Sequence, residues 1–213
     1  MYLGRIVAIG RNGAGDPGVV YRVSSRSFPN REAKILGKDI AILPKAGFEY
    51  QLNENPFIAY TCIRQISSYI VVGNGTHTDI IAAKLSNQFS MRDSLIDVLH
   101  AFDYEKDSLC TPRIAGIVNC KANVGYLGVI TKSSLHVKNF ELKKGSIYYL
   151  STYEHNYPDD NFSDHSFNVT SAKEACQYII GKGIFAEFEN SVTAASAIRD
   201  NLGEITLATA NAE

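Results

Sequence analysis

The sequence predicts an α+β fold built on antiparallel sheets. Short segments rich in β-branched residues occur in runs, and the helix-like segments cluster between these runs. Single strands alternating with helices would instead favour a doubly wound parallel sheet. The 213 residues, 45% of them hydrophobic and 20% charged, have the composition of a globular domain. We therefore expect residues 1–213 to form a single domain.

The first strands are expected to form a hairpin. Leu3–Ile9 and Val19–Ser24 have strand-like composition, and residues 12–18 between them contain Asn-Gly and Pro-Gly pairs that favour turns. Strand-like segments recur along the rest of the chain, at Asp39–Leu43, Ile58–Ile66, Tyr69–Val72, Arg113–Asn119, Val124–Ile130, Ser146–Thr152 and Ile205–Ala208.

Helices are expected between these strands. A short helix is predicted at residues 79–87. Two capping boxes, in which a serine stands three positions before an acidic residue, predict that longer helices begin after Ser90 and Ser171. The first of these is expected to end at Phe102. We also expect a helical stretch at Val192–Arg199.

Composition excludes several function classes. The net charge of −1 argues against nucleic-acid binding, which needs a basic excess to displace counterions from phosphates. The four cysteines are irregularly spaced and form no Cys-x-x-Cys pair, so neither a zinc site nor a disulfide framework is indicated. The start of the sequence does not resemble a signal peptide, and no run approaches the ~20 apolar residues of a membrane span. We expect a cytoplasmic protein that binds no metal, nucleic acid or membrane.

Common nucleotide-binding and hydrolase motifs are missing from the sequence. It contains no Walker loop, no H-E-x-x-H and no G-x-S-x-G. Residues 13–18 match G-x-G-x-x-G, but a strand follows them where that motif requires a helix. We interpret this match as a glycine-rich hairpin turn.

Residues 21–31, YRVSSRSFPNR, place three arginines and three serines around the end of a strand. Pro29 cannot donate to a sheet and favours a loop. Arginine presents a fork of donors that matches phosphate or carboxylate oxygens. A ligand cradle and a solvated basic hairpin edge remain equally compatible with these residue types.

A second polar segment, FDYEKD at residues 102–107, follows the predicted helix and is itself followed by Thr111-Pro112-Arg113. Three acids at a helix C-terminus oppose the helix dipole, which slightly favours a functional role over a solvated helix end. One of these carboxylates could act as a general base.

A third polar segment, residues 73–79, precedes a predicted helix. Thr78 or Asp79 as a simple N-cap is the preferred interpretation. The alternative is that Asn74, His77 and the helix amides hold an anionic or heterocyclic ligand. Tyr60 could belong to the core, stack on a base, or do both.

Taken together, these segments resemble the archaeal-type IMP cyclohydrolase family. The resemblance covers nearly the whole chain and is carried by Met1–Arg5, Tyr21–Arg31, Asn74–Asp79, Asp103–Asp107 and Thr111–Ala115. It implies a fold like that of the N-terminal nucleophile hydrolases, a four-layer α-β-β-α sandwich with two packed antiparallel sheets. The sequence begins Met1-Tyr2, which cannot supply their nucleophile. The resemblance thus implies that the fold is kept and the nucleophile chemistry is lost.

The resemblance also implies a reaction, closure of the purine ring of 5-formamidoimidazole-4-carboxamide ribonucleotide to IMP with loss of water, the last step of de novo purine biosynthesis. Glu105 is the implied base, Arg31 the oxyanion partner, and Tyr60 an orienting or stacking group. No cofactor is implied, the expected partner is the nucleotide substrate, and a homo-oligomer is compatible with the sequence. Expected substrate-binding residues are Ser24, Arg26, Ser27, Asn30, Asn74, Thr76, His77, Tyr104, Asp107, Thr111 and Arg113.

Two other hypotheses remain compatible with the residues. One is a hydrolase of the N-terminal nucleophile type, such as an amidase, which would need processing to expose a nucleophile. The other is a non-catalytic nucleotide-binding module, which would explain the Arg/Ser segment but leave Glu105 without a role.

Overall fold

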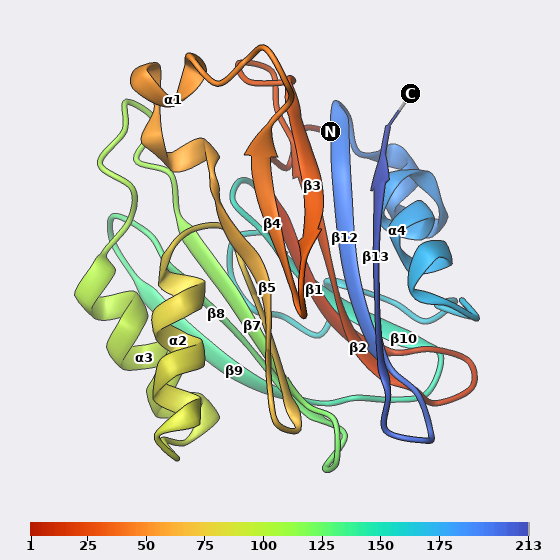
Figure 1. Cartoon of the computed structure of the whole chain (residues 1–213). Helices are drawn as coiled ribbons and strands as arrows, with labels where there is room; N and C mark the ends of the chain where they lie inside the picture. Colours follow the sequence, from red (N-terminus) through yellow and green to blue (C-terminus); the bar gives the residue numbers. More distant parts are fainter. Residues whose placement is uncertain (213) are drawn as a thin grey trace.

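A computed structural model describes residues 1–212 and contains two antiparallel sheets with helices on their outer faces (Figure 1). The first sheet has six strands in the spatial order β11-β10-β1-β2-β12-β13. Their bounds are Ile6–Arg11 for β1, Pro17–Ser24 for β2, Ser146–Ser151 for β10, Ser163–Asp164 for β11, Ser191–Arg199 for β12 and Ile205–Asn211 for β13.

The second sheet has seven strands in consecutive order from β3 to β9, each antiparallel to the next. Their bounds are Arg31–Leu36 for β3, Asp39–Pro44 for β4, Tyr60–Ile66 for β5, Tyr69–Gly73 for β6, Arg113–Asn119 for β7, Val124–Ile130 for β8 and Leu135–Glu141 for β9. The helices are α1 (Gln51–Glu54), α2 (His77–Ser86), α3 (Met91–Phe102) and α4 (Ala172–Gly181), with 3₁₀ turns η1 (Pro56–Ile58) and η2 (Gly183–Glu187).

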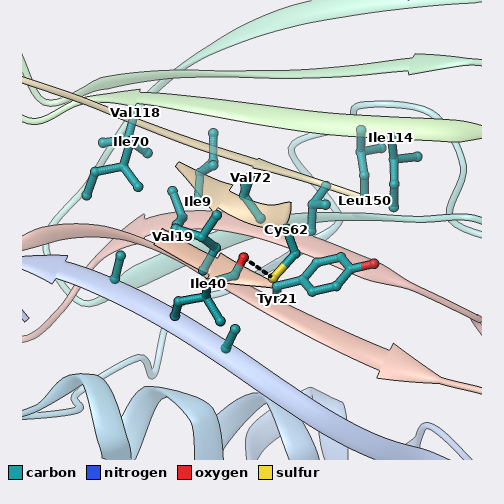
Figure 2. Close-up of a cluster of buried hydrophobic side chains, with 14 of the residues drawn as sticks. Ile9, Val19, Tyr21, Ile40, Cys62, Ile70, Val72, Ile114, Val118 and Leu150 are labelled. Carbon is teal, nitrogen blue, oxygen red and sulfur yellow. Dashed lines mark hydrogen bonds between the residues drawn. The ribbon is translucent and has the colours of Figure 1, made fainter. Parts of the chain in front are cut away.

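Three apolar clusters hold these layers together. The first lies between the sheets, where side chains such as Ile9 and Val19 of one sheet meet Ile70 and Val72 of the other (Figure 2). The second joins the outer face of the six-stranded sheet to α4, and the third joins the seven-stranded sheet to α2 and α3. The layers are therefore helix, sheet, sheet and helix, as in the expected α+β sandwich. No helix within residues 1–212 has the length and apolar character that crossing a bilayer requires.

The N-terminal hairpin and the helix starts after Ser90 and Ser171 are confirmed. β1 and β2 pair directly, and the Asn12 side chain closes their turn by accepting from the amides of Gly15 and Asp16 at 2.8 Å each. Ser90 Oγ accepts from Asp93 N at 3.0 Å, and Ser171 Oγ accepts from Glu174 N at 3.2 Å. Local hydrogen bonding by these short polar side chains satisfies amides that would otherwise lack a partner.

The helix expected at Val192–Arg199 is wrong, because this segment is strand β12, which lies between β2 and β13. Ala195 and Ala197 face the other sheet, whereas Ala194 and Ile198 face α4. Alanine favours helices intrinsically, but here small side chains on both faces let a sheet and a helix pack closely around a buried strand. The edge strands β3 and β9 were not predicted from the sequence either, and most of their residues are partly or fully exposed.

Candidate active site

Segments distant in the sequence meet at one end of the sandwich (Figure 1). Arg5 immediately precedes β1, Arg31 begins β3, Tyr60 begins β5, and Glu105 lies in the loop between α3 and β7. The larger of two cavities at this site, called the main cavity, has a volume of about 150 Å³ and is lined by Arg5, Arg31 and Glu105 among others. A small cavity of about 20 Å³ is lined by Tyr60 and Glu105 among others. Glu105 is thus common to both cavities.

Glu105 is a buried carboxylate with one oxygen bound and one oxygen free. Its side chain is 2% exposed, and Oε2 accepts a hydrogen bond from Arg5 Nη2 at 3.2 Å. Oε1 lies 3.6 Å from Arg113 Nη1 and has no hydrogen-bond partner among residues 1–212. Burial raises the pKa of Glu105, although the positive charges of Arg5 and Arg113 oppose this shift. A carboxylate with a raised pKa is a stronger base.

The other acids of this loop organise its backbone. Asp107 accepts from Thr111 N at 2.9 Å and from Thr111 Oγ1 at 2.7 Å, while Asp103 pairs with Lys106 at the surface. The loop backbone is closed by Glu105 N, which donates to Thr111 O at 2.8 Å. These contacts explain why three acids follow the helix, and they leave Glu105 as the buried acid of the three.

Arg31 brings a charged donor group to the main cavity. Its side chain is 2% exposed, and Nε donates to Phe28 O at 3.1 Å. Its terminal nitrogens have no hydrogen-bond partner in the part of the chain that the structure describes. Burial lowers the pKa of Arg31, and nearby Tyr60 opposes this shift, so the guanidinium remains charged. Such a group can stabilise negative charge on a ligand oxygen.

Tyr60 is paired with a second buried tyrosine. Its hydroxyl lies 2.7 Å from that of Tyr21, and the two rings meet edge to face. Burial raises the pKa of both phenols, so both keep their protons near neutral pH. Either hydroxyl can be the donor of the bond between them. When Tyr21 donates this bond, the Tyr60 proton is available to a ligand.

We expect Tyr21→Phe to raise the pKa of Tyr60, because the phenolate loses a donor. The variant also leaves a buried hydroxyl with one partner fewer, which we expect to lower the free energy of unfolding by about 1–3 kcal/mol. Alkaline titration of ¹³Cζ-tyrosine-labelled protein by NMR measures the pKa. Tyr126→Phe, on β8, is the control and should leave the Tyr60 signal unchanged. A lower pKa of Tyr60 in Tyr21→Phe would show that Tyr21 does not stabilise the Tyr60 phenolate.

Five of the expected substrate-binding residues border the site. Ser27, Asp107 and Thr111 line the main cavity, and Thr76 and Arg113 line the small cavity. Both oxygens of Asp107 are already hydrogen-bonded to Thr111, so Asp107 mainly stabilises the loop that borders the cavity.

Six other expected residues line neither cavity, and two of these are fully engaged inside the protein. Ser24 Oγ accepts from Arg22 Nε at 2.9 Å. Asn74 donates to Pro112 O at 3.0 Å and accepts from Ile114 N at 2.8 Å. These bonds hold strands and loops in place and leave both side chains buried. The structure does not support a direct ligand contact by either one.

Arg26, Asn30, Tyr104 and His77 also line neither cavity. Arg26 is exposed, covers the Tyr2 ring and pairs with Glu189 at 3.4 Å. Asn30 and Tyr104 are partly buried. His77 is buried and its Nε2 lies 3.1 Å from Ile114 O, while burial lowers its pKa to about 3 and keeps it neutral.

The N-cap interpretation of residues 73–79 is wrong as well. α2 begins at His77, so Thr78 and Asp79 lie inside its first turn. Thr78 Oγ1 donates back to Gly75 O at 2.8 Å, and Asp79 pairs with Arg64 at 3.0 Å. The segment instead connects the start of α2 to β7 through side-chain bonds to backbone.

The sequence did not point individually to Arg5, Tyr21, Phe57 and Tyr153 as site residues. Arg5, Phe57 and Tyr153 line the main cavity, and Tyr21 supports Tyr60. Arg5 belongs to the segment Met1–Arg5 that carries the family resemblance, but it lies inside the expected strand Leu3–Ile9 and no motif singles it out. The others have the composition of core or surface aromatic residues, and only the fold brings them to the site.

Comparison with known proteins identifies the family. Residues 2–203 match the family model described as IMP cyclohydrolase-like protein. A protein of Methanosphaera stadtmanae named IMP cyclohydrolase is 43% identical over 96% of this chain and 98% of its own length. Relatives of the same name from Methanocaldococcus jannaschii and Methanococcus aeolicus are 45% and 40% identical, covering 95% and 98% of this chain and 96% and 100% of their own lengths. The chain therefore belongs to the IMP cyclohydrolase-like family.

Proposed function

We propose that this protein is an IMP cyclohydrolase, which closes the purine ring of 5-formamidoimidazole-4-carboxamide ribonucleotide in the last step of de novo purine biosynthesis. The observation that carries the proposal is the buried Glu105 carboxylate, with one unbonded oxygen, in a cavity that also holds Arg31. The names of the relatives agree with this activity.

The reaction joins two arms of one substrate. The carboxamide nitrogen attacks the formyl carbon and loses a proton, and the formyl oxygen gains negative charge as its double bond opens. Ring closure is completed when this oxygen leaves as water, with one proton from the carboxamide nitrogen and one from the formamido nitrogen. A cavity of about 150 Å³ can hold the two arms close together, which removes unproductive rotamers.

The residues of the site match the two chemical demands. Glu105 Oε1 is free to take the proton from the carboxamide nitrogen, because Oε2 is occupied by Arg5. A general base contributes about 10²–10⁴-fold to such a step. Arg31 supplies donors for the formyl oxygen as it becomes negative. The proton on Glu105 can then return to the departing hydroxyl.

Tyr60 and the polar rim complete the proposal. We infer that the Tyr60 hydroxyl orients the carboxamide, since Tyr60 lines the small cavity beside Glu105. Ser27, Thr111, Thr76 and Arg113 are the remaining candidates for contact with the nucleotide. The nucleotide is proposed as a small-molecule partner, and the protein as cytoplasmic and acting without a cofactor.

We also infer that the chain is one domain with a fold related to the N-terminal nucleophile hydrolases. The apolar cluster shared by both sheets and the helix–sheet–sheet–helix order support this inference. The proposed chemistry uses a base and an arginine, and needs no nucleophile at the chain start.

The proposed activity is tested by mixing the purified protein with the formamido ribonucleotide and following IMP by ultraviolet absorbance. One IMP should form for each precursor consumed, with multiple turnovers per enzyme. Binding of IMP without turnover of the precursor would instead support the nucleotide-binding hypothesis. Hydrolysis of the precursor's formamide, detected as free formate, would support an amidase.

We expect Arg31→Met to lower kcat about 10²–10³-fold, because the developing oxyanion loses an aimed donor. KM should change less, since the oxygen carries little charge in the ground state. Steady-state kinetics measures both constants. Arg64→Met is a matched control, because Arg64 pairs with Asp39 and Asp79 away from the cavities. Wild-type kcat in Arg31→Met would remove Arg31 from the proposed reaction.

A further inference from the structure

We infer that Arg5 is a positioning residue for the proposed reaction, which holds Glu105 by Oε2 so that Oε1 is the atom that acts as the base. The inference rests on the proposed function for the identity of the reaction. The contact itself is a property of the fold. None of the sequence motifs assigned a role to this arginine.

The first support is the asymmetry of the carboxylate. Arg5 Nη2 donates to Oε2 at 3.2 Å, which fixes one oxygen of Glu105. Arg113 Nη1 is 3.6 Å from Oε1, close enough for charge attraction but without a hydrogen bond. A buried oxygen without a partner costs free energy unless a ligand or another donor satisfies it. The amide proton of a bound carboxamide is such a donor.

The second support is the way in which the backbone places Arg5. Arg5 N donates to Thr152 Oγ1 at 3.1 Å, and Thr152 N donates to Arg5 O at 3.0 Å. The preceding Gly4 has φ +72°, a conformation that other residues rarely adopt. A Cβ at Gly4 would lie 2.2 Å from Thr152 Oγ1 and 2.8 Å from the Tyr153 ring. Gly4 therefore lets the chain turn closely against this strand end and direct Arg5 into the cavity.

The third support is electrostatic. Burial acts to lower the pKa of Arg5, but Glu105 and the surrounding tyrosines outweigh burial and raise it, so Arg5 stays charged. Arg5 is also the strongest of the charges that lower the pKa of Glu105. The charged and titratable groups that face Glu105 are Arg5, Arg31, Arg113, Asp107 and Tyr60. Removal of Arg5 is therefore expected to raise the pKa of Glu105 further.

The sign of the pH effect follows directly. Glu105 acts as a base only when it is ionised, so activity is lost as pH falls through its pKa in the enzyme. A higher pKa in Arg5→Met moves this loss to higher pH. Arg5→Lys keeps the positive charge but replaces the planar guanidinium by a point charge. In this variant kcat should fall, while its decline toward low pH should occur at nearly the same pH as in wild type.

The test compares wild type, Arg5→Met, Arg5→Lys and Arg11→Met by kcat, KM and the pH dependence of kcat. Arg11 lies at the other end of β1 and bonds to the carbonyls of Gly15 and Leu142, so it is the matched control. We expect kcat to fall about 10²-fold in Arg5→Met, as for a misplaced catalytic group, with KM little changed. Arg11→Met should keep both constants.

The alternative outcomes separate the roles. A rise in KM with wild-type kcat would make Arg5 a substrate-binding residue and overturn the inference, as would an acid limb that does not move. If Arg5→Met fails to fold, Arg5→Lys tests the inference through its kcat and the acid side of its pH profile. An unchanged kcat in Arg5→Lys would show that the planar guanidinium is not needed, and would overturn the inference. If the wild-type protein makes no IMP, the proposed function is wrong, but the effect of Arg5 on Glu105 can still be measured. NMR titration of ¹³Cδ-glutamate-labelled protein then still tests the inference, which requires a higher pKa of Glu105 in Arg5→Met.

Discussion

Glu105→Gln is expected to lower kcat for IMP formation about 10²–10⁴-fold, the usual contribution of a general base. Glutamine keeps the size and one acceptor oxygen of Glu105, so the hydrogen bond from Arg5 can persist. It cannot take a proton from the carboxamide nitrogen. KM should change little, because the base acts on a proton that moves in the transition state. Single-turnover kinetics with saturating enzyme separates this chemical step from product release.

Asp103→Asn is the matched control for this variant. Asp103 belongs to the same loop, but it lies at the surface and pairs with Lys106. We expect wild-type kcat in Asp103→Asn, because its charge is solvated and lies outside both cavities. Equal activity of Glu105→Gln and wild type would show that another group, or water alone, accepts the proton.

The same burial that makes Glu105 a stronger base also affects folding. Its pKa is raised in the folded protein, so the native state binds a proton more tightly than the unfolded chain does. This contribution to stability is present at low pH and is lost as pH rises through the folded pKa. Glutamine does not titrate, so Glu105→Gln should not lose stability as pH rises. We therefore expect this variant to be folded at neutral pH and to unfold cooperatively.

Elements that are stabilised locally could be predicted from the sequence. The Ser90 and Ser171 caps and the Asn12 turn depend on side chains that bond to nearby backbone, so short-range patterns reveal them. β12 could not be predicted in this way. Its alanines favour a helix locally, and the strand conformation is set by partners on both sides, β2 and β13, that are distant in sequence.

The three residues to which the family resemblance gave catalytic roles are brought close together by the fold, while the roles themselves stay predictions. Glu105 and Arg31 are brought to the main cavity, as the family resemblance implied, and Tyr60 lies beside Glu105. Only part of the arginine- and serine-rich segment at residues 21–31 reaches the site, because successive side chains of a strand point to opposite faces of the sheet. Tyr21 faces the other sheet, whereas Arg22 and Ser24 face α4 and cannot reach the cavity.

Arg22 has a structural role that its residue type did not suggest. It is 0% exposed, although it carries a charge, and its hydrogen bonds go to backbone carbonyls and Ser24. Nη1 donates to the carbonyls of Ile179, Ile180 and Phe185 at 3.1–3.2 Å, and Nη2 donates to those of Phe188 and Glu189. The C-terminal carbonyls of a helix lack intrahelical partners and carry partial negative charge. Arg22 therefore fastens the end of α4 and η2 to β2.

Arg22→Met should lower the free energy of unfolding by about 3–5 kcal/mol, because several buried carbonyls lose their donor at once. For a chain of this size that corresponds to a fall in Tm of roughly 6–20 °C. Amides at the end of α4 and in residues 183–189 should also exchange faster with solvent. The control is Arg199→Met, which removes a single bond, Nε to Gly203 O at 3.1 Å, and should cost about 0.5–1.5 kcal/mol. A loss in Arg22→Met no larger than in Arg199→Met would show that the carbonyls are satisfied without the arginine, and that α4 is held by its apolar face alone.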